Sequence, residues 1–118
     1  MPNLRLNKVH CKNYTSEIEI TIEILSGKWI VLLLTHLGEE KVVRFNEFRK
    51  VFPDMSQKML SQQLKKLEEN KIVKKEIFNV IPPKVEYRLT EQGEKLVPLL
   101  ESMQVWGQEY LVEFNKED

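Results

Sequence analysis

The sequence predicts one mainly α-helical domain that carries a small antiparallel β-wing, an α+β fold. Leu60, Leu64 and Leu67 recur at the spacing of a single helix face, which indicates an amphipathic helix. Further along, Pro82 and Pro83 separate two short apolar segments. Because proline removes a backbone donor, this pair marks the tip of a hairpin and not a continuous strand. The length of 118 residues suits a single domain.

The N-terminal part is expected to begin with a flexible polar arm, residues 1–14. Ser16 and Glu19 then have the spacing of a capping box, in which each side chain bonds the backbone N–H of the other residue. Isoleucine stands at every second position from 18 to 24, a pattern that is also typical of a strand. The capping box favours a helix for this segment.

Residues 28–37 are apolar on nearly every side, which predicts a second helix that is buried over most of its surface. Gly38 is placed to end that helix. Three further elements are expected before the hairpin: a short strand at 42–45, a helix at 46–51, and a helix from the N-cap Ser56 to about Asn70.

The hairpin and the C-terminal segment complete the arrangement. Residues 72–78 and 85–89 are predicted to form the two strands of the wing, and Thr90 caps a long final helix at 90–116. Two short helices around a tight turn, followed by a two-stranded wing, form the winged helix-turn-helix arrangement. We therefore expect a winged helix-turn-helix domain over residues 15–118, with dimerisation helices at both ends.

The charges are unevenly distributed, although the net charge is zero. Residues 41–88 carry 12 basic and 6 acidic side chains, whereas residues 89–118 carry 2 and 7. A polyanion responds to local positive potential and not to net charge, so the central segment is a candidate DNA surface. A lysine-rich surface without a ligand is the alternative interpretation.

Other classes of protein find no support in the sequence. No apolar run approaches the ~18 residues of a membrane span, and the first residues lack the apolar core of a signal peptide. A single cysteine, Cys11, excludes an internal disulfide, so a cytoplasmic protein is expected. We find no enzyme motif, metal-ligand spacing or cofactor motif. His36 lies on the apolar helix and is expected to be a core residue.

The helix from Ser56 presents a polar face opposite its leucine stripe. Lysine can donate to guanine and glutamine can pair with adenine in the major groove, while N–H groups at a helix N-terminus favour phosphate. The candidate DNA-binding residues are Arg44, Asn46, Ser56, Gln57, Lys58, Ser61, Gln62, Lys65 and Lys84. An ordinary solvated face, with lysines that protect strand edges, is the alternative interpretation.

The final helix carries more apolar side chains than a domain of this size needs for its own core. Large aromatic residues continue toward its C-terminus, where little chain is left to cover them. We therefore expect an isologous helix–helix interface in a homodimer. Its candidate residues are Ile18, Ile22, Leu99, Met103, Trp106, Tyr110 and Phe114. The alternative is that this helix folds back over the N-terminal helices of its own subunit.

With these residues in place, the chain resembles the HxlR family of winged helix-turn-helix regulators, which is related in fold to MarR-type regulators. The resemblance covers roughly residues 16–107. It rests on Gly27-Lys28-Trp29 and on three longer runs at 44–48, 56–60 and 82–93. It implies a cytoplasmic homodimer that regulates transcription at an inverted-repeat, pseudo-palindromic DNA operator. It further implies that the helix from Ser56 enters the major groove.

Two departures from the family pattern affect the expected regulation and structure. Many relatives carry a cysteine where this chain has Ser16, and in some of them it senses oxidants. Here Cys11 lies upstream, in the expected arm, next to basic residues that favour a thiolate. Cys11 is therefore a candidate redox residue, and a small molecule or an oxidant is a candidate effector. In the family a glycine is common after the helix that enters the major groove, and this chain has Lys71 there. We therefore expect Asn70 to be the left-handed residue that ends the helix from Ser56.

Three functions follow from these features. The leading hypothesis is a sequence-specific, dimeric transcription regulator. The alternatives are a redox- or electrophile-responsive regulator that uses Cys11, and a winged-helix protein-interaction module that does not bind DNA.

Overall fold

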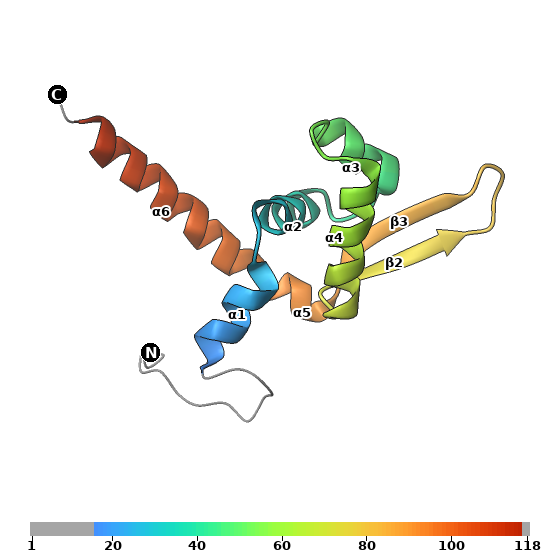
Figure 1. Cartoon of the computed structure of the whole chain (residues 1–118), viewed down its shortest axis with the longest axis horizontal. Helices are drawn as coiled ribbons and strands as arrows, with labels where there is room; N and C mark the ends of the chain where they lie inside the picture. The colour runs from blue at the N-terminus through green and yellow to red at the C-terminus, as the bar shows by residue number, and fades with distance from the viewer. Residues whose placement is uncertain (1–15, 117–118) are drawn as a thin grey trace.

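The computed structural model describes residues 16–116 and confirms a mainly helical fold with a small antiparallel sheet (Figure 1). The elements are, in chain order, α1 (Glu17–Leu25), α2 (Lys28–Glu40), β1 (Val43–Arg44), α3 (Phe45–Val51), α4 (Gln57–Glu69), β2 (Val73–Phe78), β3 (Lys84–Leu89), α5 (Glu91–Glu94) and α6 (Val97–Asn115). The expected arm at 1–14 and Cys11 lie outside the described residues.

The first isoleucine-rich segment is a helix, as the capping signal predicted. The hydroxyl oxygen of Ser16 accepts a hydrogen bond from the backbone N–H of Glu19 at 3.3 Å. Ser16 itself is only 6% exposed, so the cap is closed over by the fold. Ser16, which stands where many relatives carry a cysteine, therefore has a structural role in this chain as the cap of α1.

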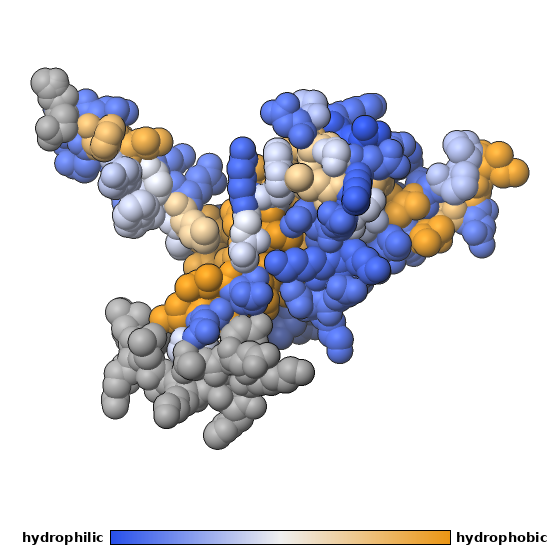
Figure 2. All heavy atoms as spheres, viewed as in Figure 1, coloured by the Kyte–Doolittle hydropathy of each residue, from blue (hydrophilic) through white to orange (hydrophobic). Residues whose placement is uncertain are grey.

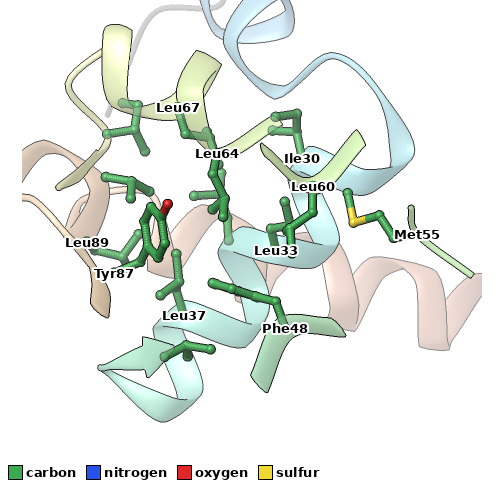
Figure 3. Close-up of a cluster of buried hydrophobic side chains, with 14 of the residues drawn as sticks. Ile30, Leu33, Leu37, Phe48, Met55, Leu60, Leu64, Leu67, Tyr87 and Leu89 are labelled. Atoms are coloured by element: carbon green, nitrogen blue, oxygen red, sulfur yellow. The ribbon is translucent and has the colours of Figure 1, made fainter. Parts of the chain in front are cut away.

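The hydrophobic core forms where α2 meets α4, α3 and the sheet (Figure 3). Ile30, Leu33 and Leu37 of α2 are fully buried, and the α4 stripe that ends at Leu67 packs into the same cluster. Phe48 of α3 lies edge-on to the ring of Tyr87 from β3, with 6.1 Å between the ring centroids. The core therefore holds α4 and the sheet in one unit.

The end of α2 differs from the prediction at Gly38. The helix continues through this glycine to Glu40 and closes at Lys41, whose φ is +72° and whose N–H donates to Leu37 at 2.9 Å. Gly38 has another role, because a Cβ there would lie 3.3 Å from Cγ2 of Val97. The glycine thus lets α6 pass close to α2.

The sheet has three antiparallel strands in the order β1-β3-β2. The wing hairpin pairs Val73 with Leu89 at its base and Phe78 with Lys84 at its tip. Val43 of β1 pairs with Tyr87 on the other edge of β3. Sequence reasoning expected β1 but not this pairing, which joins the segment before α3 directly to the wing.

The expected left-handed cap at Asn70 is also wrong. Asn70 has a φ of −82°, and Lys71 takes the left-handed conformation with a φ of +62°. The N–H of Lys71 donates to Glu68, and that of Ile72 donates to Leu67 at 2.9 Å. The chain therefore turns at the position where the family commonly has glycine.

The single final helix that was expected is two helices. Thr90 caps only the short α5, accepting a hydrogen bond from the N–H of Gly93 at 3.1 Å. The break has a local cause, because Pro98 has no N–H to donate to Glu94 and its ring would clash with that carbonyl. As a result α6 takes a new direction and extends away from the rest of the molecule (Figure 1).

Candidate nucleic-acid interface

Helix α4 presents the predicted polar face. Its buried side holds the helix on the core, and the opposite side exposes Lys58, Ser61, Gln62 and Lys65 to solvent. The hydroxyl oxygen of Ser56 accepts a hydrogen bond from the N–H of Met59 at 3.0 Å and so fixes the start of the helix. This geometry allows the side chains to reach base edges in a major groove.

The first turn of α4 has the features of a phosphate contact. Ser56 and Gln57 are both exposed, and no acidic residue lies in this turn. The unpaired N–H groups at a helix N-terminus attract anions. This end of the helix is therefore compatible with a backbone phosphate beside the groove.

Arg44 and Asn46 lie on the other side of the wing from β2, where β1 leads into α3. Both are exposed, and the backbone N–H of Arg44 donates to Oε1 of Glu47 at 2.8 Å. Together with Lys75, Lys84 and the two prolines of the tip they line a hollow of about 460 Å³. The hollow therefore brings three cations together from β1, β2 and β3.

Lys84 has partners within its own hairpin that the sequence did not indicate. Its Nζ lies 3.6 Å from Oε2 of Glu86 and 4.8 Å from the centroid of the Phe78 ring. Glu86 also approaches Arg88, with 3.8 Å between Oε1 and Nη2. Sequence reasoning missed Glu86 as a competing acceptor, although residues 84, 86 and 88 share one face of a strand and period-two spacing could have revealed it.

Helix α6 exposes most of its apolar side chains, as the dimer hypothesis expected. Trp106 is 66% exposed, Tyr110 51% and Phe114 62%, and Leu99 and Met103 are also exposed. The rings stack along one stripe, with centroids 5.2 Å apart for the first pair and 6.0 Å for the second. Figure 2 shows apolar residues along this helix.

Helix α6 packs on α2 only through its first turns, where Leu100 is buried and Val97 lies close to Gly38. The rest of the helix does not cover the N-terminal helices of its own subunit within the described residues. Ile18 and Ile22 of α1 remain exposed, at the same end of the molecule as α6 and away from the wing (Figure 1). The radius of gyration is 16.8 Å, compared with roughly 13 Å for a compact domain of this length. Both terminal helices thus present apolar surface.

The remaining sequence candidates are structural or absent from the described residues. His36 is only half-buried, at the edge of the core, where it lies edge-on to Phe48 and Phe52 with ring centroids 6.0 and 5.9 Å away. Burial, and then the nearby carboxylate of Glu68, raises the pKa of Tyr87 above 10.0. Between residues 16 and 116, no helix is long and apolar enough to cross a bilayer.

Comparison with known proteins gives one consistent result. The family described as HxlR-like helix-turn-helix matches residues 24–115. The HTH-type transcriptional regulator YdeP of Bacillus subtilis is 46% identical over 93 residues, which are 79% of this chain and 72% of that protein. The redox regulator HypR in its reduced form superimposes with a TM-score of 0.80 at 40% identity, over 86% of this chain and 99% of HypR. The reduced form of the regulator YodB from B. subtilis matches with a TM-score of 0.69 at 35% identity, over 80% and 91%.

Proposed function

Because this chain belongs to the HxlR-like helix-turn-helix family of transcriptional regulators, which are DNA-binding proteins and not enzymes, we propose that it acts as a homodimer on an inverted-repeat DNA operator. The polar face of α4, held outward by its buried leucine stripe, carries this proposal. In a bacterial cell such a regulator works in the cytoplasm, where the chromosome is.

In the proposed complex α4 lies in the major groove. Gln62 reads a base, since its amide can pair with both N6 and N7 of adenine, and Lys58 and Lys65 donate to guanine or to phosphate. Ser61 lies on the same exposed face and makes a further polar contact. Ser56 and Gln57 hold a phosphate at the N-terminus of the helix.

The wing and β1 position the protein on the DNA backbone. Arg44, Asn46 and Lys84 line one hollow, and cations at such a place neutralise phosphates without reading sequence. The ion pair between Lys84 and Glu86 has to open or be shared when phosphate arrives. Affinity is therefore expected to fall steeply with salt, because counterions are released on binding.

The dimer joins two copies through α6, with α1 at its edge. The three stacked aromatic rings provide a continuous apolar stripe, and Leu99 and Met103 extend it toward the body of the domain. Ile18 and Ile22 on α1 supply further apolar surface. A two-fold axis through this contact would place the two α4 helices in successive major grooves, about 34 Å apart.

A gel-shift titration with the intergenic DNA upstream of the gene tests DNA binding. We expect Lys84→Ala to weaken binding on all duplexes and to reduce the salt slope by about one. Gln62→Ala should instead relax discrimination at a single base position, at a cost of about 1–3 kcal/mol for the preferred base. Equal losses on specific and scrambled DNA for both variants would contradict this assignment. The absence of any shift at low salt would instead favour a protein-interaction module.

Sedimentation of the full chain tests the dimer. Trp106→Glu places a charge in the proposed apolar contact and should give a folded monomer, whose helical content is checked by circular dichroism. Glu113→Gln changes an exposed residue of α6 that pairs with Lys116, the residue after the helix, and it should leave the dimer intact. A wild-type monomer at micromolar concentration would refute the interface.

A redox response is the second candidate function. Its support is the similarity to HypR, which is described as a redox regulator. Cys11 is the one cysteine of the chain, and it is the residue that would carry such a response here. DNA binding that is lost after oxidant treatment in the wild type, but retained in Cys11→Ser, would support this function. Equal loss in both proteins would exclude Cys11 as the sensor.

A further inference from the structure

The tip of the wing is apolar, which the proposed phosphate contacts do not explain. Ile81 is 101% exposed and Val80 is 52% exposed, and both prolines that follow are exposed as well. Figure 2 shows hydrophobic residues at the far end of the hairpin, beyond the hydrophilic surface of α4. A contiguous apolar group at the most exposed point of a molecule indicates a contact surface.

The surface directly behind the tip is suited to a polyanion. Arg44, Lys75 and Lys84 line the hollow under Pro82 and Pro83, so three cations from three strands flank the apolar group on its inner side. A phosphate chain would be attracted to this hollow, and the tip would then lie beside that chain. The charge pattern therefore selects DNA over an apolar protein partner.

The size of the apolar group supports the same choice. A stable protein interface covers about 800 Å² on each partner, far more than the tip of a two-stranded hairpin presents. The minor groove of DNA is only ≈ 6 Å wide, and it accepts narrow apolar wedges such as isoleucine and proline between base steps. Each strand of the wing has six residues, a reach of roughly 20 Å.

We propose that Ile81 enters the minor groove next to each half-site and wedges open a base step, so that the operator is read partly through its deformability. This inference rests on the proposed DNA-binding function. The cations of the hollow hold the adjacent phosphates, and the two prolines restrict the backbone behind the isoleucine. Steps such as TA and CA unstack at low cost, so they are preferred at the flank of the operator.

The test uses the full-length protein and a duplex that it selects from random sequence. Bending is measured by the gel mobility of circularly permuted fragments, and unstacking by the fluorescence of 2-aminopurine placed at the flanking step. The wild type is expected to bend the duplex by at least about 20° and to raise the fluorescence. Ile81→Ala should lose both effects and bind a duplex with flanking TA steps about tenfold more weakly.

A matched control separates the wedge from general damage to the wing. Ile77→Ala shortens another exposed isoleucine of the wing, which is 59% exposed but lies on β2 below the tip. It should bend and bind DNA like the wild type. Duplexes with rigid GC steps at the flank should bind the wild type and Ile81→Ala equally.

The outcomes distinguish this inference from the proposed function. If the protein selects no duplex at all, the proposed DNA-binding function itself is overturned. If Ile81→Ala selects, binds and bends DNA like the wild type, the wedge is overturned while the proposed function of α4 stands.

Discussion

Of the four glycines, Gly93 is the one at which an added methyl group should disturb this fold most. It lies in α5, at the junction between the wing and α6. A Cβ there would meet the backbone oxygen of Ile72 at 2.2 Å and the side chain of Leu89 at 3.1 Å. The same oxygen accepts a hydrogen bond from the N–H of Thr90 at 2.9 Å. The hydroxyl of Thr90 donates to the neighbouring carbonyl oxygen of Lys71 at 2.6 Å and lies 3.1 Å from that of Ile72.

The cost of Gly93→Ala follows from these contacts. The backbone has to move by about 1 Å to restore van der Waals distance, and overpacking of this kind costs about 1–3 kcal/mol. Lengthening the hydrogen bond from the Thr90 N–H to Ile72 adds about 1 kcal/mol, while alanine returns about 0.5–1 kcal/mol in a helix. We therefore expect the free energy of unfolding to fall by about 2–3 kcal/mol.

Urea unfolding followed by circular dichroism measures this change. All variants are compared at one protein concentration, because the proposed dimer would gain stability by mass action. Gly38→Ala is the matched control. Its new Cβ would meet only the two methyl groups of Val97, at 3.3 and 3.9 Å, and that side chain can adjust. The control should stay within about 1 kcal/mol of the wild type. A Gly93→Ala protein as stable as this control would refute the reasoning from the close contact.

Three further changes test other features of the structure. Glu86→Gln breaks the ion pair with Lys84 and removes a negative charge near the proposed phosphates, so DNA affinity in a gel shift should rise about threefold. An unchanged affinity would show that Glu86 does not compete with phosphate for Lys84. Lys71→Gly should raise the free energy of unfolding in urea by about 0.5–1 kcal/mol, because glycine tolerates a φ of +62°. The control Asn70→Gly changes a residue with a φ of −82° and should bring no gain. Because the pKa of Tyr87 is raised in the folded protein, the stability that its neutral form contributes is present below about pH 10 and is lost as pH rises through that pKa. Tyr87→Phe should therefore reduce the loss of stability that is measured above pH 10. An identical alkaline profile for both proteins would contradict the burial argument.

The errors of sequence reasoning have a common physical origin. Gly38 and Asn70 have the residue types that end helices, yet the chain turns at Lys41 and Lys71, both with positive φ. At Gly38 the glycine serves a contact with Val97, which is distant in sequence and has no local signature. The break before α6 was predictable in principle, because Pro98 cannot donate to Glu94.

The sequence by itself determined the local elements of the candidate interface. The leucine stripe and the Ser56 cap define α4 and its exposed face, and the two prolines define the tip of the wing, because periodicity, capping and missing donors act within a few residues. The excess of apolar residues in the last segment likewise predicted an exposed aromatic helix.

Only the tertiary structure decided how these elements meet. It pairs β1 with β3, so that Arg44 lies in one hollow with Lys75 and Lys84, and it sends α6 away from the core and leaves its aromatic stripe exposed. These outcomes depend on close contacts between segments far apart in the chain, such as Gly93 against Ile72, and residue patterns within one segment do not record them.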